Sequence, residues 1–256
     1  MTQVSITVIT VVYNAANLIE RTLRSVAEQN WNSVNHLIVD GGSTDGTLQV
    51  IREFSSPRIT LHTGPDKGIY DAMNKGLERA VGDYVIFINA GDEFADNEVL
   101  SNLMQKCQNS DVYYGDTLIV DSNRNVTGRR RHRPPKQLTW KSFRMGMLVS
   151  HQSILARRSI CPRYNLDYKI SSDIDWTIRL MKRAESICYF EKPVSLFLAG
   201  GESTKRKRLG LIERWKLSTL HYGFVITSFA HLAIAFRALY YAVNSMFMRP
   251  EDFRKT

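Results

Sequence analysis

Cysteine is scarce in this chain: the three that occur among its 256 residues, Cys107, Cys161 and Cys188, form no CxxC pair. Three scattered cysteines are typical neither of a disulfide framework nor of a zinc site, so we expect neither, and we expect a reducing compartment. We also expect no signal peptide, because the first apolar stretch, Val4–Val12, is short, β-branched and not preceded by a basic region, and is therefore typical of a strand. These absences favour a cytoplasmic protein.

Several catalytic signatures are absent as well. The glycine-rich GxGxxG turn that a nucleotide-dependent oxidoreductase needs after its first strand is replaced by Val11-Val12-Tyr13-Asn14. No Ser/His/Asp or Cys/His set and no internal repeat is evident. The sequence therefore disfavours dinucleotide chemistry, covalent nucleophilic catalysis and repeat architectures.

Positive charge is in excess. The formal net charge is +9, with 43% hydrophobic and 23% charged residues, a composition that is ordinary for a globular protein. A basic surplus favours anionic partners such as phosphorylated substrates or acidic lipid. We expect no nucleic-acid partner, because no RNA- or DNA-binding module accompanies the basic runs at 129–133 and 205–208.

The first half of the chain alternates β-branched runs with helical patterns, which predicts an α/β fold with a doubly wound, mostly parallel sheet. The expected strands are Val4–Val12, Val34–Asp40, Arg58–His62 and Tyr84–Asn89, and the expected helices are Ala15–Gln29, Thr44–Phe54 and Ile69–Ala80. Later runs indicate a mixed sheet: a hairpin at Asp111–Val120 and Val126–Arg131, strands at Leu148–Ala156 and up to Leu198, and a helix over Ser172–Arg183. We expect one domain over residues 1–204, with halves at 1–96 and 97–204, and a basic, apolar helical extension over 205–256.

Polar residues follow the first strands, at the edge where open α/β sheets bind ligands. The ring of Tyr13 can stack on a base, and Asp40 can accept a hydrogen bond from a pyrimidine N–H. Lys67, with Asp66 and Asp71, stands just ahead of a helix and can meet a ribose or a phosphate. Each group has a plainer alternative as turn and helix-capping residues, and residue type alone leaves both interpretations open.

The run Asn89-Ala90-Gly91-Asp92-Glu93 follows the most apolar of the strands. A carboxylate at the end of a buried strand is costly unless it is paired, hydrogen-bonded or bound to a metal ion. Mg²⁺ and Mn²⁺ take oxygen ligands, often one or two carboxylates plus substrate phosphates. The run is therefore a candidate metal site.

The second half offers a candidate general base. Asp173 lies at the start of an expected helix, in the run Ser171-Ser172-Asp173-Ile174-Asp175-Trp176. The alternative is that Ser172 caps this helix and that both aspartates merely occupy its first turn. The pair His151-Gln152 lies beside an expected strand, where it could bind an acceptor or a phosphate; the alternative is a core histidine.

Taken in this order, these runs resemble the family-2 glycosyltransferases of GT-A fold, over about residues 4–203. The resemblance is carried by Ile38–Thr47, Gly68–Gly76 and Ser150-His151-Gln152, and the bacterial exopolysaccharide branch of the colanic-acid type is the most similar. It implies a mostly parallel, doubly wound sheet with a mixed-sheet acceptor half. It also implies inverting transfer of a hexosyl group from a nucleotide sugar, with a UDP-sugar favoured, to a hydroxyl of a glycan or of a polyprenyl-diphosphate-linked saccharide in surface polysaccharide biosynthesis.

The resemblance assigns residues to the donor side. The nucleotide-sugar site is expected to include Val11, Tyr13, Asp40, Lys67, Asp71 and Gly91. Asp92 matches the last, metal-binding aspartate of the family's DxD-type motif, which implies Mn²⁺ or Mg²⁺ as cofactor. Asn89 and Gly91 stand where the family commonly has carboxylates, so a single acidic anchor is left.

On the acceptor side, Asp173 matches the catalytic aspartate of the family's ED-type motif, and Ser172 replaces the usual glutamate. His151, Gln152 and Ser203 are expected near the acceptor. Because the metal and base motifs both lack carboxylates that the family commonly has, a second class of protein stays open. It is a non-catalytic carbohydrate- or membrane-binding module on a decayed GT-A scaffold.

The C-terminal region joins the charge run Lys205–Arg208 to an apolar segment, Tyr222–Met248. On a helix its apolar side chains share one face, which consists of Val225, Phe229, Leu232, Phe236, Leu239, Tyr240, Val243 and Phe247. A membrane span is disfavoured, because a central arginine such as Arg237 costs about 2.5–3.5 kcal/mol. The remaining alternatives are an interfacial anchor on an anionic membrane and a helix packed on the domain or in a homo-oligomer. We expect the anchor, and so a peripheral protein on the inner face of the cytoplasmic membrane.

Overall fold

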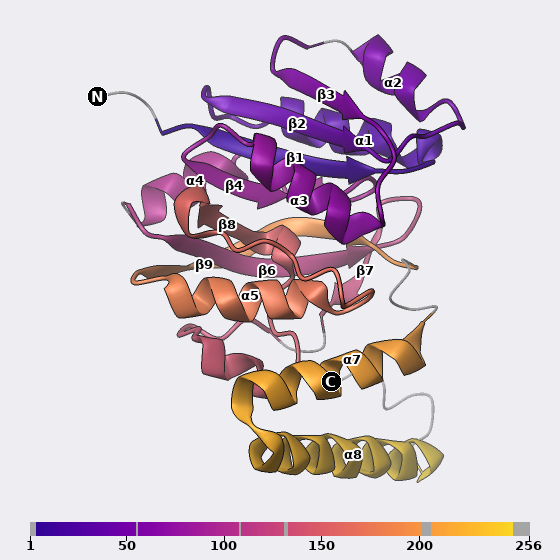
Figure 1. Ribbon diagram of the computed structural model, residues 1–256, viewed down its shortest axis with the longest axis vertical. Coiled ribbons are helices and arrows are strands. Elements are labelled where there is room, and N and C mark those ends of the chain that lie inside the picture. The colour runs from indigo at the N-terminus through magenta and orange to yellow at the C-terminus, as the bar shows by residue number, and fades with distance from the viewer. Residues whose placement is uncertain (1–3, 55, 108, 131–132, 201–205, 248–256) are drawn as a thin grey trace.

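The structure is a computed structural model that describes residues 4–54, 56–107, 109–130, 133–200 and 206–247. Among these residues a mixed β-sheet runs through the molecule with helices on both faces, and a helical hairpin lies at one end (Figure 1). The strand order is β3-β2-β1-β4-β8-β6-β9-β5, with β7 paired to β6. This arrangement is the GT-A-like α/β fold that the sequence predicts.

The part of the sheet that the resemblance assigns to the donor is parallel; we name it the donor half, and the rest of the sheet the acceptor half, after that expectation. It consists of β1 (Ile6–Val12), β2 (Val34–Asp40), β3 (Ile59–Thr63) and β4 (Tyr84–Phe87). All seven residues of β1 are buried, because this strand has a neighbour on each side and a helical layer on each face. Near-continuous apolar character is what such a strand requires.

The second half of the sheet is mixed. It consists of β5 (Glu93–Phe94), β6 (Val112–Val120), β7 (Val126–Arg129), β8 (Ile154–Arg157) and β9 (Ile187–Leu198). β8 runs antiparallel to both β4 and β6 and thereby joins the two halves, while β6 and β9 are parallel. The predicted hairpin is present as β6 and β7.

Helices cover both faces of the sheet. On one face α3 (Ile69–Arg79) and α5 (Ser172–Arg183) pack around Met73 and Trp176. The other face carries α1 (Ala16–Ala27), α2 (Thr47–Phe54) and α4 (Val99–Lys106). Short 3₁₀ turns η1 (Trp140–Met145), η2 (His151–Ser153) and η3 (Arg158–Ile160) connect the later elements.

The predicted bounds of a helix or strand agree with the structure where its hydrophobic pattern continues without interruption. β2 and α5 have the predicted bounds, and the other elements of the donor half differ by a few residues. The predicted strand Leu148–Ala156 is wrong in its first part, because residues 151–153 form η2 and the strand begins at Ile154.

The cysteine prediction needs a correction. Cys107, which follows α4, forms a disulfide with Cys188 on β9, and only Cys161 is free. The two residues are 81 positions apart in the chain but lie together where α4 packs beneath β9. Their spacing therefore hid the pair, and the inference of a reducing compartment loses its basis.

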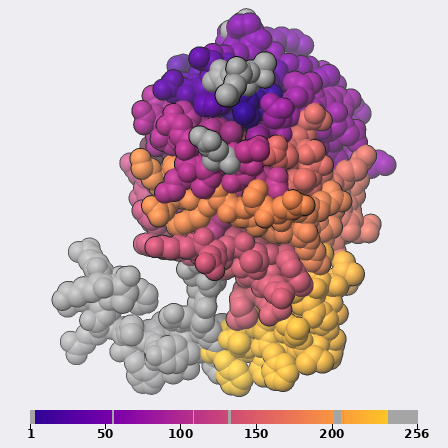
Figure 2. Space-filling view, turned by 90° about the vertical axis from the view of Figure 1, so that its left-hand side faces the viewer, coloured from indigo at the N-terminus to yellow at the C-terminus, as the bar shows by residue number. Residues whose placement is uncertain are grey.

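The C-terminal hairpin consists of α7 (Lys207–Tyr222) and α8 (Phe224–Phe247). α7 packs on the domain, since Leu217 and Tyr222 are buried in the same core as α5. α8 lies outside α7, at the end of the molecule that Figures 1 and 2 show lowest. Among the described residues, no helix has both the length and the apolar character that a bilayer crossing requires.

Candidate active site

Three loops of the donor half meet at the carboxyl edge of the sheet. Tyr13 follows β1, Gly41 follows β2, and Asp66 comes after β3. A Cβ on Gly41 would meet Asp66 Oδ2 and would lie 3.3 Å from Tyr13 Cδ2, so the two side chains approach each other across this glycine. The Tyr13 ring is 64% exposed and is therefore available to stack on a flat ligand.

Asp40 is fully buried at the tip of β2. Its carboxylate accepts hydrogen bonds from the Gly42 N–H (2.9 Å), the Ser43 N–H (3.1 Å) and the Thr63 hydroxyl (2.7 Å). Burial by itself raises the pKa of Asp40, but these hydrogen bonds outweigh it and the pKa lies below its usual value. Asp40 therefore shapes the turn that follows β2, a role that its position alone does not reveal.

Lys67 and Asp71 lie at the start of α3. The Asp71 carboxylate accepts a hydrogen bond from the Lys67 backbone N–H (3.0 Å) and pairs with Lys75 Nζ (3.0 Å). The backbone hydrogen bond from Lys67 is the largest cause that lowers the pKa of Asp71. Asp71 thus acts as a first-turn residue of the helix, while the side chain of Lys67 is exposed.

A tight turn follows β4. Gly91 has φ +95°, a left-handed conformation that favours glycine, and its N–H donates to the Thr22 hydroxyl (2.9 Å). The carbonyl of Val11 accepts the Ala90 N–H (3.3 Å), which joins this turn to the end of β1. Backbone geometry thus explains the glycine at a position where the resemblance leads us to expect a carboxylate.

Asp92, directly after this turn, is buried. Its Oδ2 accepts a hydrogen bond from Gln152 Nε2 (3.0 Å), and its Oδ1 accepts one from the Leu198 N–H at the end of β9 (3.1 Å). Burial raises the pKa of Asp92 to about 6, although both hydrogen bonds act in the opposite direction. This carboxylate therefore connects the donor half of the molecule to the acceptor half.

The turn η2 lies between the two candidate functional carboxylates, Asp92 and Asp173. Gln152 contacts Asp92, and the preceding residue, His151, places Nδ1 at 3.8 Å from Oδ2 of Asp173. His151 is buried, and neither of its ring nitrogens has a hydrogen-bond partner among the described residues. Leaving a buried imidazole without a hydrogen-bond partner is costly, so we expect a polar group of a ligand to hydrogen-bond to His151.

Asp173 is the second residue of α5, and its side chain is one-quarter exposed. Burial by itself raises its pKa, but His151 and the positive charge of Arg130 outweigh this effect and the pKa lies below its usual value. The carboxyl is therefore ionised at neutral pH, as a proton acceptor must be. Tyr70, on α3, places its hydroxyl 3.4 Å from Asp173 Oδ1.

Asp175 points elsewhere. Its carboxylate accepts a hydrogen bond from Arg179 Nε (2.7 Å) and contacts His221 Nε2 (2.8 Å) on α7. Asp175 therefore ties α5 to α7 and does not replace the missing helper carboxylate beside Asp173.

Sequence reasoning missed three residues around the base: Tyr70, Arg130 and Glu213. Tyr70 lay within a recognised run but shows no local sign of contact with a residue 103 positions later. Glu213 contacts the loop before α5 from α7, which lies within the predicted helical extension, but no local pattern indicates this contact. Ser203 lies outside the described residues.

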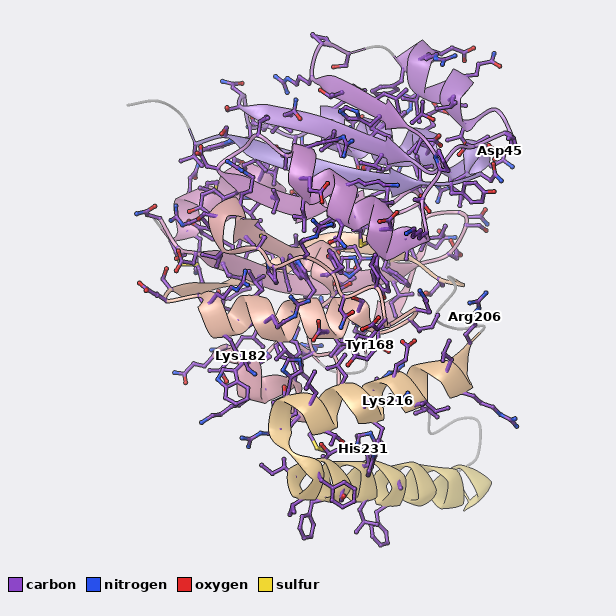
Figure 3. All side chains as sticks on the ribbon, in the orientation of Figure 1. Asp45, Tyr168, Lys182, Arg206, Lys216 and His231 are labelled. Atoms are coloured by element: carbon purple, nitrogen blue, oxygen red, sulfur yellow. A yellow bond between two sulfur atoms is a disulfide. The ribbon has the colours of Figure 1, made fainter. Side chains whose placement is uncertain are left out.

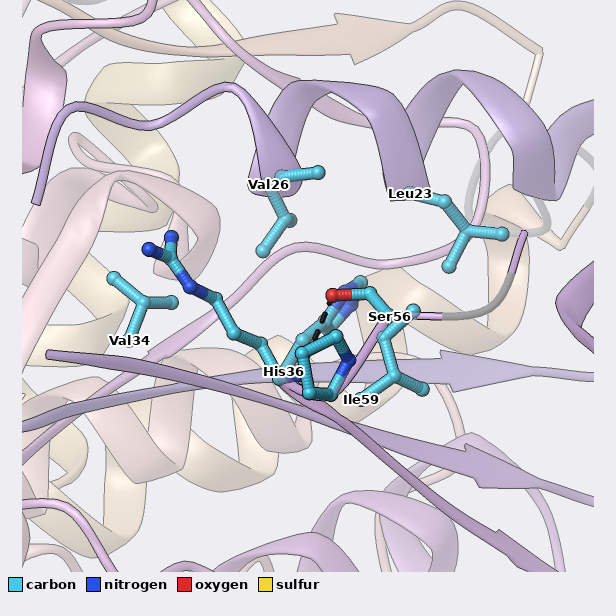
Figure 4. A pocket seen from close by; sticks show the side chains of 9 residues that line it. Leu23, Val26, Val34, His36, Ser56 and Ile59 are labelled. Carbon is cyan, nitrogen blue, oxygen red and sulfur yellow. Dashed lines mark hydrogen bonds between the residues drawn. The ribbon is translucent and has the colours of Figure 1, made fainter. Parts of the chain in front are cut away.

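A separate cavity of about 310 Å³ lies between α1 and the amino ends of β2 and β3 (Figure 4). It is lined by apolar side chains such as Leu23 and Val34, together with Arg58 and the buried His36. Burial lowers the pKa of His36 to about 3, so this imidazole is neutral. The cavity is at the opposite edge of the sheet from Asp40 and Asp92 and is not part of the candidate active site.

The residues present fit a divalent ion that a diphosphate would largely hold. Among the described residues no cluster of three or more His, Cys, Asp or Glu side chains could bind a metal ion on its own. However, within the described part of the chain Asn89 Oδ1 is buried with no hydrogen-bond partner, and each oxygen of Asp92 accepts one hydrogen bond. Hard oxygen ligands of this kind, completed by phosphate oxygens, suit Mg²⁺ or Mn²⁺.

Known proteins share this fold. The mannosyltransferase PcManGT from Pyrobaculum calidifontis, solved with GDP-Man and Mn²⁺, superposes with a TM-score of 0.63 at 17% identity over 98% of this chain and 82% of its own. The S. aureus TarS fragment 1–349 in complex with UDP-GlcNAc gives a TM-score of 0.63 at 20% identity over 79% of this chain and 61% of its own. At these identities the likeness shows the fold alone.

Sequence comparison identifies the family. PGL/p-HBAD biosynthesis glycosyltransferases of Mycobacterium bovis and Mycobacterium tuberculosis are 31% identical over 175 residues, which is 65% of this chain and 65% of theirs. The match thus spans just under two thirds of the length of these relatives. Residues 7–164 match the family described as "Glycosyl transferase family 2". Since this match covers more than half of the chain and includes every strand-end loop of the donor half, the chain belongs to glycosyltransferase family 2.

Proposed function

We propose that this chain is an inverting, metal-assisted hexosyltransferase that uses a nucleotide sugar, with a UDP-sugar favoured. The observation that carries the proposal is the bridge formed by His151 and Gln152, which contact Asp173 and Asp92 respectively. Asp92, which is suited to bind a metal ion on a diphosphate, and Asp173, which is suited to act as a base, therefore both lie next to η2. The bound states of PcManGT and TarS, with GDP-Man and with UDP-GlcNAc, agree with a nucleotide-sugar donor.

The chemistry is a single displacement. The acceptor oxygen forms a bond to the anomeric carbon as the bond from that carbon to the nucleoside diphosphate breaks. Asp173 takes the proton of the acceptor hydroxyl, a role worth about 10²–10⁴-fold. His151, whose ring nitrogens have no hydrogen-bond partner among the described residues, would orient that hydroxyl. When a Mn²⁺ or Mg²⁺ ion is bound by Asp92 and Asn89, it supplies positive charge that stabilises the departing diphosphate.

The acceptor class follows from the family and from the charge. The relatives above are named as glycosyltransferases of PGL/p-HBAD biosynthesis, and another is named as a putative glycosyltransferase of teichuronic acid biosynthesis. We therefore favour a hydroxyl of a glycan or of a polyprenyl-diphosphate-linked saccharide in surface polysaccharide synthesis, and the colanic-acid branch stays a prediction. The direct test is a thermal-shift screen of nucleoside diphosphates and nucleotide sugars with and without Mn²⁺. Metal-dependent stabilisation by one nucleotide supports the proposal, and no stabilisation by any nucleotide contradicts it.

Replacing Tyr13 by alanine should weaken binding of the nucleoside diphosphate about 5- to 150-fold, because stacking of a base on an aromatic ring is worth about 1–3 kcal/mol. Calorimetric titration measures this change. The melting temperature should stay unchanged, since the ring is largely exposed. Asp40→Ala is the comparison: it should lose both affinity and stability, because three donors lose their acceptor. Parental affinity in the Tyr13 variant would remove this residue from the donor site.

We also propose that the C-terminal hairpin holds the enzyme at an anionic membrane surface. The described part of the predicted apolar face of α8, namely Val225, Phe229, Leu232 and Phe236, is 54–71% exposed. His231 lies on the opposite side of α8, packed on Trp215 of α7 at 4.7 Å between ring centroids (Figure 3). α8 therefore turns its apolar side outward, which a protein surface rarely does unless a partner covers it.

The positive charge of the same region favours an anionic membrane as the partner. Between Ser203 and Pro250 the sequence has eight lysines and arginines but a single acidic residue, Glu213. The Glu213 side chain is buried against backbone N–H groups, so it does little to offset the positive charge of this region at the surface. Each basic residue near an anionic bilayer contributes about 1 kcal/mol.

The membrane proposal predicts co-sedimentation with phosphatidylglycerol-containing vesicles, weaker binding to pure phosphatidylcholine vesicles, and weaker binding at high salt. Phe229→Asp should reduce the bound fraction about tenfold or more, because it puts a charge into the apolar face. Val81→Asp is the matched control, since Val81 is equally exposed (72%) but lies on the catalytic domain. Equal retention of both variants would contradict the proposal, and concentration-dependent association without vesicles would favour a homo-oligomer instead.

A further inference from the structure

Glu213 of α7 holds the segment of chain that leads into the base helix. Its carboxylate is buried and accepts three backbone hydrogen bonds, from Lys169 (2.7 Å), Ile170 (2.9 Å) and Ser171 (2.9 Å). These residues immediately precede α5, and Asp173 is the second residue of that helix. One side chain from the C-terminal hairpin thus binds the backbone next to the candidate general base.

The same segment is fixed from the donor half. The Tyr70 hydroxyl donates to the Ile170 carbonyl (2.8 Å) and also lies near the Asp173 carboxylate. α7 approaches closely at Gly210, where an added Cβ would lie 3.4 Å from Ile170 Cγ2. Residues 169–171, which we name the base loop, are therefore clamped between α3 and α7.

The base loop depends on this clamp because all three of its N–H groups donate to Glu213. The third is the N–H of Ser171, the N-cap residue of α5, whose own side chain makes no capping hydrogen bond. Hydrogen bonds to a carboxylate are stronger than those between neutral groups. Loss of the Glu213 carboxylate would free the loop and let the start of α5 shift.

We propose that Glu213 is a positioning residue for the transfer reaction: by fixing the base loop it sets the orientation of Asp173 toward the acceptor hydroxyl. This inference rests on the proposed role of Asp173 as general base. Glu213 itself touches no reacting group. Its effect arises because a displacement of about 1 Å in a catalytic group can cost about 10²-fold in rate.

The test compares Glu213→Ala and Glu213→Gln with Leu217→Ala in the full chain. Leu217 is buried one turn further along α7, so its truncation loosens the same helix without touching the base loop. Glu213→Ala should lower kcat for nucleoside diphosphate release about tenfold or more, with KM for the nucleotide sugar and nucleotide affinity near parental values. Glu213→Gln keeps one acceptor oxygen and should lose less. Leu217→Ala should lower the melting temperature while kcat stays within about twofold.

An equal loss of kcat in Leu217→Ala and Glu213→Ala would overturn the proposal, because stability alone would then explain both. Loss of nucleotide affinity along with kcat would overturn it as well. If the alanine variant does not fold, Glu213→Gln decides: an unchanged kcat contradicts the role and a reduced kcat supports it. Hydrogen exchange at the amides of residues 169–171 gives a readout independent of turnover. If the parent protein turns over no nucleotide sugar, the proposed function is wrong. Hydrogen exchange tests the clamp separately: unchanged exchange at residues 169–171 in Glu213→Gln would show that Glu213 does not fix the base loop.

Discussion

Asp173→Asn is expected to lower sugar transfer by about 10²-fold or more while nucleotide affinity stays near the parental value. Asparagine has the size of aspartate and can keep the contact with the Tyr70 hydroxyl, but it cannot accept a proton. The measurement is kcat for nucleoside diphosphate release, together with calorimetric titration of the nucleotide. A loss in kcat without a loss in affinity is the signature of a group that acts only in the transition state.

Asp175→Asn is the control for this substitution. The Asp175 carboxylate bridges Arg179 and His221, so Asp175→Asn should lower the melting temperature. It should lower kcat less than Asp173→Asn does. If the Asp173 variant transferred sugar normally and the Asp175 variant were inactive, the base would lie two residues later than proposed.

Asp92→Asn is expected to abolish turnover and the metal-dependent part of nucleotide binding. Asp92 is the only carboxylate in the turn that could face the diphosphate, and an amide supplies no negative charge to a divalent ion. The substitution also places an NH₂ group opposite either Gln152 Nε2 or the Leu198 N–H, so some loss of stability should accompany it. Nucleotide titrations with and without Mn²⁺ separate the two effects.

Glu93→Gln is the matched control for the metal site. Glu93 is the next residue and is equally buried, but it pairs with Arg124 on the surface side. This variant should therefore keep metal-dependent binding. Full activity of the parent protein in EDTA would contradict the metal proposal whatever the variants do.

The donor half could be predicted because its signals are local. Buried strands such as β2 read as continuous apolar runs, and the residues at their carboxyl ends must share one edge of the sheet. The approach of Tyr13, Gly41 and Asp66 follows from this rule together with the order of the strands. The bounds of α5 were likewise readable, because its amphipathic period is uninterrupted over twelve residues.

Contacts between distant segments could not be predicted in the same way. Nothing near Cys107 indicates Cys188, and nothing near Asp173 indicates Tyr70 or Glu213. The hydrogen bonds that make Asp40 part of a turn depend on atoms of the next loop and of β3. Such pairings are set by how elements pack, which a single sequence does not encode locally.

One measurement addresses the central claim most directly. The purified full chain is incubated with a panel of nucleotide sugars, Mn²⁺ and a membrane lipid extract, and both nucleoside diphosphate release and the mass gain of the lipid-linked acceptor are followed. We expect one nucleotide sugar to give both signals in equal amounts, and both to fall by about 10²-fold or more in Asp173→Asn. Neither signal with any donor, or equal transfer by the parent and the variant, would contradict a glycosyltransferase that uses Asp173 as its base.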